Sequence, residues 1–466
     1  MSEAKQPRPP APPSLPGHFL FGNAQEFYAD RLRFLQHVAQ THGDVVRYRL
    51  GCEWYYLVND PREARDILRD WEHIDNATSD GGFQLDHSFI AKNGKERVIP
   101  RSISHSSICP RAVSSMHGRI VEAVQRMFSD WEDGQERDVL LDMMKMNVEV
   151  VSVVLFGRRA ESWLSPVLHV LTDLQMLIGA YTTSEQTRDR MHVQRRRKIF
   201  DQVEGMVERL LAEITTEDEV PSLKIFRRAH ADGKLSEREV IHEMCVLLLS
   251  VSSTAVAAMW TWLCLSRNPR VWDALETELD TLPSGPIAAA DLERLSYLPA
   301  VLKEVLRLMP PLGVLHRKIE HDWDRGSYVL PASEHLHVSP YLLHRHPAHW
   351  HDPEQFRPER FDPQSPWHHP DQDVAYMPFA VGVRHCIGET LAWHQLQVMV
   401  ATIARRFRPE VAAEHELPYD VSPLGSLHPV ALTMPVRLRE RRRAAPLHSP
   451  SSAPAAGAEA RDRSPA

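Results

Sequence analysis

The amino-acid sequence predicts a mostly α-helical protein with small β-sheets. Apolar residues recur at helical spacing in the ranges 26–42, 61–71, 235–267 and 297–308, and this periodicity is typical of helices that bury one face. Two alternating apolar stretches, Val45 to Leu50 and Trp54 to Asn59, flank Gly51 and indicate a β-hairpin. Helices therefore dominate the prediction, and a small sheet is expected near the N-terminus.

The composition is that of a soluble globular protein. Of the 466 residues, 43% are hydrophobic and 25% are charged, which is unlike disordered or membrane proteins. The formal net charge of −8 argues against nucleic acid as a partner, because nucleic-acid-binding proteins carry basic surfaces. The five cysteines show no paired spacing, which favours a reducing cytoplasm over an oxidising compartment.

The two ends of the chain differ from its middle. Residues 1–17 are rich in proline and polar groups, so we expect a flexible segment that is neither a signal peptide nor a membrane anchor. Residues 437–466 open with a basic run, Arg437 to Arg443, and continue through Ala, Pro and Ser. We expect this part to be a disordered tail, and the whole protein to be cytoplasmic.

The longest helical pattern runs from Leu235 to Arg267. It opens with a capping box formed by Ser236 and Glu239 and closes before Asn268 and Pro269. At 1.5 Å per residue such a helix would be about 50 Å long. We therefore expect a single helix that crosses the whole folded part.

One cysteine lies in a sequence suited to an iron-binding thiolate. The stretch from Phe379 to Gly388 reads Phe-Ala-Val-Gly-Val-Arg-His-Cys-Ile-Gly. A cysteine sulfur binds iron as the anion, so it needs backbone N–H dipoles and a nearby cation that lower its pKa. Gly382 permits a tight turn, Gly388 permits close approach of a flat macrocycle, and Arg384 supplies the cation. We expect Cys386 to bind heme iron; the alternative is a buried cysteine in a glycine-containing turn.

Three further motifs precede this cysteine. Glu304 and Arg307 lie in the helical pattern of residues 297–308, where such a pair is usually a surface ion pair worth about 0.3–0.5 kcal/mol. The second motif is Pro358-Glu-Arg-Phe361, and the third is Met309-Pro-Pro311 followed by His316 and Arg317. Each motif alone is weak, but their order along the chain is informative.

With these motifs the chain resembles the cytochrome P450 family. The residues that carry the resemblance in the cysteine loop are Phe379, Gly382, Arg384, Cys386 and Gly388. The resemblance covers residues 18–436 and implies the family's fold in one large helical domain. It also implies a heme b cofactor with Cys386 as the axial thiolate ligand, and a buried charge network of Glu304, Arg307 and Arg360 that braces this side of the heme.

The resemblance implies further contacts to the heme. Arg101 and Arg317 would bind its propionates, Arg384 would lie on the cysteine side, and Phe379 would pack against the ring. Relatives carry a tryptophan where this chain has Arg97. Arg97 is therefore a second propionate candidate or, as an alternative, a solvated surface charge.

The centre of the long helix departs from the family's pattern. Relatives have a small residue, a glycine, any residue, an acid and a threonine, and the acid and alcohol deliver protons to iron-bound dioxygen. This chain reads Ser250-Val251-Ser252-Ser253-Thr254, so Ser253 replaces the acid and Val251 the glycine. A serine hydroxyl relays protons only through water. The candidate catalytic residues are Thr254, Ser253 and Ser250.

The substrate pocket is expected to draw on several segments. In relatives the stretch that corresponds to residues 75–92 covers the pocket, so its apolar residues are candidates, with ordinary core packing as the alternative. The candidate pocket residues are Phe83, Leu85, Phe89, Ile90, Val251 and Leu312.

Histidines gather in the last third of the chain. His335 and His337, and the group of His344, His346, His349 and His351, have spacings seen in metal sites. Relatives carry a histidine or asparagine in the place of His344, so we expect a structural role instead.

These features predict oxidative tailoring of a small, largely apolar natural product, by hydroxylation or oxidative coupling. No flavin or iron–sulfur segment is evident in the chain, so a dioxygen route would need a separate ferredoxin and ferredoxin reductase. The altered helix centre leaves a second mechanism open, in which the substrate brings an activated N–O or O–O bond and no electrons are delivered. A further alternative is a heme-binding sensor without catalysis, which a turnover assay would distinguish.

Overall fold

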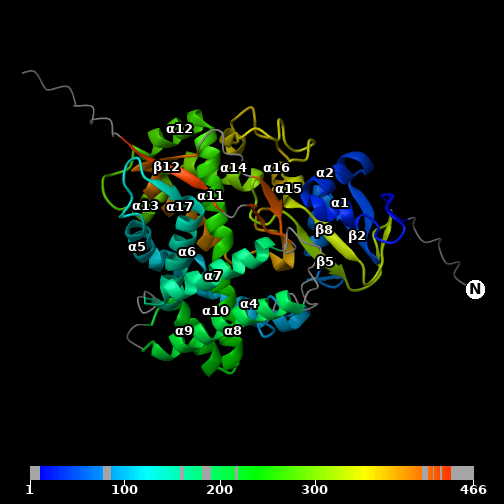
Figure 1. Cartoon of the computed structure of the whole chain (residues 1–466), viewed down its shortest axis with the longest axis horizontal. Coiled ribbons are helices and arrows are strands. Elements are labelled where there is room, and N and C mark those ends of the chain that lie inside the picture. The colour runs from blue at the N-terminus through cyan, green and yellow to red at the C-terminus, as the bar shows by residue number, and fades with distance from the viewer. Residues whose placement is uncertain are drawn as a thin grey trace, which may run out of the picture.

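The computed structural model describes residues 11–76, 85–157, 162–180, 190–215, 219–411, 418–422, 425–430 and 433–441. Within these ranges, helices form most of the molecule and short strands form small sheets, which confirms the predicted fold class. Figure 1 shows most helices gathered on one side of the molecule and a sheet of early (blue) and later (yellow) strands on the other.

The first helices differ slightly from the predicted ranges. α1 (Ala24–Ala29) and α2 (Arg31–His42) replace the single helix expected over residues 26–42. The cause is Asp30, which is extended and accepts the amide of Arg33 at 2.9 Å, so that it caps α2. α3 (Pro61–Arg69) occupies the range predicted for the next helix. α4 (Val98–Ser107) carries Pro100 in its first turn, where a missing N–H costs no helical hydrogen bond.

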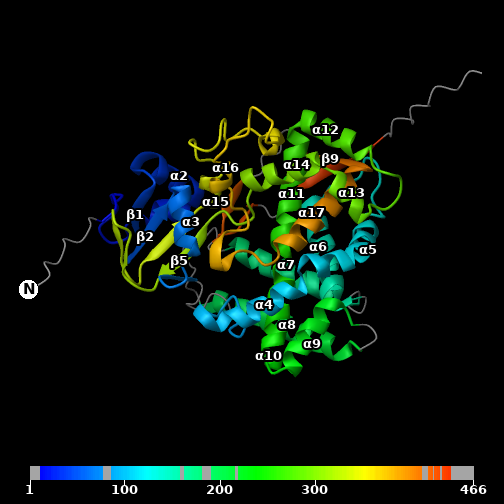
Figure 2. The ribbon, with the colours of Figure 1, turned by 180° about the vertical axis from the view of Figure 1, so that it is seen from behind.

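The remaining helices build the larger, helical part of the molecule. They are α5 (Pro110–Met127), α6 (Val139–Phe156), α7 (Leu164–Ala180), α8 (Arg190–Glu213), α9 (Pro221–Ala231), α10 (Glu237–Leu249), α11 (Val251–Arg267), α12 (Pro269–Leu279), α13 (Ala289–Arg294), α14 (Tyr297–Leu308), α15 (Pro340–Leu343), α16 (Gln372–Ala375) and α17 (Glu389–Ala404). α11 passes through the middle of this part and packs against α6, α14 and α17 (Figures 1 and 2).

The strands form one larger sheet and several small ones. The larger sheet has the order β1-β2-β8-β5-β3, with β1 (Val45–Leu50), β2 (Glu53–Val58), β3 (Ile74–Asn76), β5 (Leu315–Ile319) and β8 (His335–Val338). β4 (Glu136–Asp138), β12 (Pro435–Glu440) and β9 (Phe407–Glu410) form a second sheet. In the described part of the chain there are also two strand pairs: β6 (Trp323–Asp324) with β7 (Val329–Leu330), and β10 (Tyr419–Val421) with β11 (Leu427–Pro429).

The predicted hairpin is confirmed. β1 and β2 are antiparallel, with Leu50 opposite Glu53, and Gly51 turns the chain at a φ of 63°. β2 then pairs in parallel with β8, which places Tyr55 opposite His335. The sheet therefore joins the first part of the chain directly to the segment that precedes the cysteine loop.

The long central helix is broken, which corrects the prediction of one helix from Leu235 to Arg267. The Ser250 hydroxyl donates to the carbonyl of Leu247 at 2.7 Å, and the amide of Ser253 points to the carbonyl of Ser250 at 3.4 Å, a tighter turn than in an α-helix. α10 ends before Ser250 and α11 begins after it. The capping box of Ser236 and Glu239 opens α10 as predicted. Residues 237–267 are long and apolar enough to cross a membrane, but 78% of their most apolar stretch is buried inside the protein, as in a core helix.

Both ends of the described chain are paired with the folded part. In the segment expected to be flexible, Pro13 and Leu15 exchange backbone hydrogen bonds of 2.9 Å with Arg47 in β1. The expected tail boundary at residue 437 is too early, because β12 continues through Arg437 and Leu438 to Glu440 and pairs with β4 and β9. Its alternating pattern buries Leu438 completely. The remaining tail residues, 442–466, and residues 1–10 lie outside the described ranges.

Candidate active site

A cavity of about 420 Å³ brings most of the predicted site residues together. It lies between the junction of α10 and α11, the cysteine loop with the start of α17, the loop of residues 85–93, and α4. Most of its wall is apolar. The polar side chains in the wall include Ser250, Ser253, Thr254, Arg97, Arg101, Arg317, Arg384, His385, Cys386 and Gln395.

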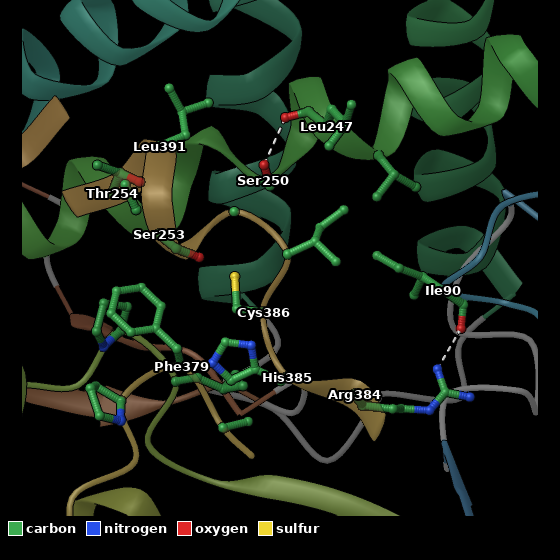
Figure 3. Close-up of a pocket in the computed structure, with 18 of the residues that line it drawn as sticks. Ile90, Leu247, Ser250, Ser253, Thr254, Phe379, Arg384, His385, Cys386 and Leu391 are labelled. Carbon is green, nitrogen blue, oxygen red and sulfur yellow. Dashed lines mark hydrogen bonds between the residues drawn. The ribbon is translucent and has the colours of Figure 1, made fainter. Parts of the chain in front are cut away.

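Cys386 presents its thiol to this cavity. Its amide donates to the carbonyl of Phe379 at 2.9 Å, which closes the cysteine loop, and the side chain is open to the cavity. In Figure 3 the sulfur points toward the side of the cavity that carries Ser250 and Ser253. The deep position raises the pKa of the thiol, although the amides of Gly388 and Glu389 and the charge of Arg101 act in the opposite direction. A metal ion bound to the sulfur would favour the thiolate, because a cation beside it stabilises the negative charge.

The two glycines of the cysteine loop have different positions. Gly388 lines the cavity at the start of α17, as predicted. Gly382, which was predicted to permit the tight turn of this loop, does not line the cavity, so only its indirect role through the backbone agrees with the structure. It has a φ of 75°, and a Cβ there would lie 2.1 Å from the carbonyl oxygen of Leu68. Gly382 is required because the loop passes against the end of α3.

The predicted arginines gather at one side of the cavity. Burial lowers the pKa of Arg97 to about 10, and Arg384 and Arg101 add to the effect by repulsion. Burial and the same kind of repulsion lower the pKa of Arg317 to about 10. Arg97 is only 8% exposed, so the alternative of a solvated surface charge is wrong. A buried cluster of cations favours an anion between them.

Two of these arginines also hold the cysteine loop and the loop before α4. Arg101 donates to the backbone carbonyl of His385, the residue before Cys386. Arg384 donates to the Asp75 carboxylate at 2.8 Å and to the side-chain oxygen of Asn93 at 2.6 Å. It also donates to the carbonyl of Ile90 at 3.1 Å (Figure 3). Asp75 and Asn93 were not predicted, because isolated polar residues leave no signal in a single sequence.

These features fit a heme group. The cavity has an accessible thiol on one wall, an arginine cluster that would match the two propionates, and an otherwise apolar surface that suits a macrocycle. Phe379 lines the cavity next to the thiol, where the ring contact was predicted. The residues present are those that would hold such a group.

The predicted charge network joins α14 to the turn Pro358–Phe361, which precedes the cysteine loop in the chain. Glu304 accepts from Arg307 at 2.7 and 2.9 Å and from Arg360 at 3.2 Å, and all three side chains are at most 1% exposed. The two arginines also donate to backbone carbonyls, including those of His344 and Asp352. The structure thus brings together the three residues that the sequence motifs singled out. The Glu304–Arg307 pair is buried, so it is not the surface ion pair that the sequence left open as the alternative.

His344 links this network to the segment before the cysteine loop. Its Nδ1 lies 3.1 Å from the carbonyl oxygen of Arg307, which can only accept, so Nδ1 carries the proton. Its Nε2 accepts the amide of Met377 at 2.9 Å. Both partners require the neutral ring, and burial lowers the pKa of His344 to about 3. The expected structural role of this histidine agrees with these contacts.

The altered helix centre faces the cavity. Ser250, Val251, Ser253 and Thr254 line it, whereas Ser252 is not among the lining residues. The Ser250 hydroxyl is held by the carbonyl of Leu247, as the dashed line in Figure 3 marks. Ser253 and Thr254 place hydroxyl groups where an acid and an alcohol were expected from relatives.

The predicted pocket residues divide into three groups. Phe89, Ile90, Val251 and Leu312 line the cavity. Leu85 does not: it is 1% exposed and packs in the main core, and a turn in which the Ser88 amide donates to its carbonyl lies between it and Phe89. Phe83 lies outside the described residues.

One buried carboxylate at the edge of this site was missed. Glu243 lies on α10, is fully buried, and binds the amide of Phe89. A glutamate at a core position of the helical pattern was the signal that could have found it.

Comparisons with known proteins agree with this architecture. The family model described as Cytochrome P450 matches residues 12–433. The chain is 27% identical over 427 residues to cyclooctatin synthase from Streptomyces melanosporofaciens, covering 85% of this chain and 89% of that protein. It is 26% identical over 456 residues to pentalenene oxygenase from Streptomyces avermitilis, covering 92% and 96%. Retinoic acid bound cyanobacterial CYP120A1 has the same fold, with a TM-score of 0.80 at 21% identity over 93% of this chain and all of that one.

The family match covers nearly the whole described fold, from residue 12 to residue 433, and ends just before β12. Proteins of this family bind heme through a cysteine thiolate and act as oxidoreductases. The cavity with its thiol, arginine cluster and apolar wall, together with this match, leads to one conclusion: the chain belongs to the cytochrome P450 family and is a heme-thiolate oxidoreductase.

Proposed function

We propose that this enzyme oxidises a small, largely apolar terpenoid in the cavity above Cys386. The observation that carries the proposal is the wall of that cavity: the thiol faces hydroxyl groups of α11 across a space lined mainly by aliphatic side chains. Two relatives are named cyclooctatin synthase and pentalenene oxygenase; pentalenene is a terpene hydrocarbon, which supports a terpenoid as the substrate class.

Cys386 would be the axial ligand of the heme, and Arg97, Arg101 and Arg317 would bind its propionates. Bound heme iron with a thiolate ligand supplies the oxidising chemistry. The Arg384 guanidinium already binds Asp75 and Asn93, so its part is to hold the adjacent loops as well as to add positive charge.

The ligand assignment can be tested by spectroscopy. Cys386→Ala should lose the long-wavelength Soret band of the reduced carbon-monoxide complex, because no other thiol lines the described cavity. Cys52→Ser is the matched control, since Cys52 is exposed on the hairpin turn. A Cys386→Ala protein that keeps this band would overturn the assignment.

Within the cavity, this chain would move protons through hydroxyl groups and water. Ser253 and Thr254 line the wall, and the Ser250 hydroxyl is fixed by Leu247. A hydroxyl accepts one proton and donates another without changing charge, so it can orient water but cannot store a proton as a carboxylate does. Proton delivery would therefore depend on ordered water between Ser253 and Thr254.

A second mechanism is favoured by the same feature. Because Ser253 stands where relatives have an acid, the enzyme could act on a substrate that carries an activated N–O or O–O bond. Such a reaction would need neither dioxygen nor electrons from a ferredoxin and its reductase. The two mechanisms share the fold, the heme and the apolar pocket, and differ in their requirement for partners.

Product formation should be measured in two assays. The first is aerobic and uses terpene alcohols with NAD(P)H, ferredoxin and reductase. The second is anaerobic and uses oxime or hydroperoxide substrates without a redox partner. In the first mechanism, Thr254→Ala should raise the reduction of dioxygen without product and Ser253→Asp should improve coupling. Ser252→Ala is the control, since Ser252 is not a lining residue. Product only with reductase and dioxygen, with coupling unchanged by Ser253→Asp, would remove the basis of the second mechanism. No turnover under either condition would favour a sensor.

A further inference from the structure

Glu243 is a buried carboxylate that the proposed chemistry does not use. It lies on α10, seven residues and about two helical turns before Ser250. Its side chain is fully buried, and it is not among the residues that line the cavity. A fully buried carboxylate is costly unless its oxygens are hydrogen-bonded, so its partners indicate its role.

The two oxygens of Glu243 bind two different walls of the cavity. Oε1 accepts the backbone amide of Phe89 at 2.6 Å, and Oε2 accepts the hydroxyl of Ser104 on α4 at 2.6 Å. Phe89 and its neighbour Ile90 line the cavity. Arg101, one turn before Ser104, also lines it and lies with its guanidinium 5.8 Å from the centre of the Phe89 ring. One carboxylate thus fixes the loop and α4 against α10.

Neighbouring residues of α10 hold the same loop at its ends. The amide of His87 donates to Nδ1 of His242 at 3.2 Å, and Lys92 forms an ion pair with Glu239. These two contacts lie nearer to solvent, whereas Glu243 binds the part of the loop that reaches the cavity. On the opposite side, Arg384 donates to the carbonyl of Ile90. The loop wall is therefore held between α10 and the cysteine loop.

The chemistry of the contact favours a precise position. Burial raises the pKa of Glu243 to about 7, while Ser104, the amide of Phe89 and the charge of Lys92 act in the opposite direction. Hydrogen bonds to a charged acceptor are short and directional. A backbone amide held in this way fixes the direction of the Phe89 and Ile90 side chains more firmly than apolar packing alone.

We propose that Glu243 is a positioning residue that sets the place of Phe89 and Ile90 in the cavity wall and thereby the length of apolar substrate that fits. It touches neither the substrate space nor the heme space and acts through the loop. The inference rests on the proposed function only in that the cavity binds an apolar substrate. The hydrogen bonds of Glu243 to Phe89 and Ser104 do not depend on which reaction the enzyme performs.

The test uses heme-loaded protein and two ligands of different length, imidazole and 1-dodecylimidazole, whose binding is followed by difference spectroscopy at pH 8. Glu243→Ala should change the ratio of their dissociation constants at least tenfold, because the long chain must pass the Phe89 wall and imidazole need not. Hydrogen exchange at the Phe89 amide should become at least tenfold faster. Glu243→Gln should restore both values, because its amide oxygen can accept from Phe89 while its NH₂ group donates to Ser104. Glu237→Gln, at an exposed position of the same helix, is the matched control.

Several results would overturn the proposal. One is a Glu243→Ala enzyme with a lower melting temperature but an unchanged ratio of the two constants, since that would be a purely structural effect. Unchanged exchange of the Phe89 amide is another. If Glu243→Ala does not fold, Ser104→Ala removes one of the two donors and should shift the ratio in the same direction; no shift there contradicts the proposal. Failure of the terpene assays leaves this test intact, because it needs no turnover.

Discussion

The guanidinium of Arg101 donates a hydrogen bond to the backbone carbonyl of His385, the residue that precedes Cys386. A side chain from α4 therefore fixes the loop that presents the thiol. The same guanidinium lines the cavity beside Arg97 and Arg317. One residue can thus connect the position of the cysteine to the charge that faces a heme propionate.

Arg101→Ala should release heme faster than the wild-type protein, because it removes both a cation and a support of the cysteine loop. Arg101→Lys should be intermediate, since an ammonium supplies the charge but not the planar fork. The measurement is the rate of heme transfer to excess apomyoglobin, with the exposed Arg111→Ala on α5 as control. Equal transfer rates for Arg101→Ala and wild type would show that the contact has no part in holding heme.

Removal of either Glu304 or Arg307 from the buried network should strongly lower the stability of the fold. Glu304→Ala or Arg307→Ala leaves an unpaired buried charge and should lower the free energy of unfolding by about 3–5 kcal/mol. The matched control is Arg62→Ala, which removes an exposed ion pair with Asp371 at 3.2 Å and should cost less than about 1 kcal/mol. Urea unfolding measures both. Similar losses for the buried and exposed variants would contradict the network's importance.

Gly382→Ala should destabilise the cysteine loop more than the same change at another glycine of positive φ. A Cβ at Gly382 would lie 2.1 Å from the carbonyl oxygen of Leu68, whereas nothing lies within 4 Å of one at Gly51, whose φ is 63°. Both substitutions incur about 1–2 kcal/mol of backbone strain, but only Gly382→Ala adds an overlap worth about 1–3 kcal/mol. Melting temperature and heme content measure the difference. If Gly51→Ala is equally damaging, the close approach to α3 is not the cause.

The neutral ring of His344 should make stability depend on pH. Its folded pKa is about 3, below the value near 6.5 of an unfolded histidine. Between these values the unfolded chain binds the extra proton, so the free energy of unfolding falls as the pH decreases from about 6.5 toward 3. One such group contributes at most about 1.4 kcal/mol per pH unit.

His344→Gln should make the free energy of unfolding depend less on pH. The glutamine amide can donate to the Arg307 carbonyl and accept from the Met377 amide, but it does not titrate. Urea unfolding at several pH values gives the slope. The exposed His105→Gln on α4 is the control and should keep the wild-type slope. If His344→Gln also leaves the slope unchanged, the acid sensitivity comes from other groups, such as the buried His337 with its pKa of about 3.

The sequence predicted well those features that local chemistry determines. The hairpin at Gly51 follows from two alternating runs around one glycine, so a short stretch of sequence contains its physical cause. The charge network and the hydroxyl groups of Ser250, Ser253 and Thr254 were instead predicted through the resemblance to the family, because the motifs alone are weak.

The features that were missed depend on contacts between distant segments. Gly382 was predicted to permit a turn, which its φ of 75° confirms, but its close approach to the carbonyl of Leu68 was not predicted. The break at Ser250 is an exception, because its hydroxyl takes the carbonyl of Leu247 only three residues earlier; it was missed because a serine in a helix does not always form this bond. Glu243 has its partners at Phe89 and Ser104. No pattern within one segment records such a contact.

The parallel pairing of β2 with β8 has a consequence for how the protein is made. Tyr55 leaves the ribosome long before its partner strand at His335, so β2 has an unpaired edge during most of synthesis. The cysteine loop is translated later still, and its supports at Leu68, Asp75 and Arg101 must already be in place. The nascent chain therefore carries an exposed strand edge and an unfinished cofactor pocket until β8 and the cysteine loop have been synthesised. Heme can be held only after that point, and until then the open edge of β2 can pair with other chains.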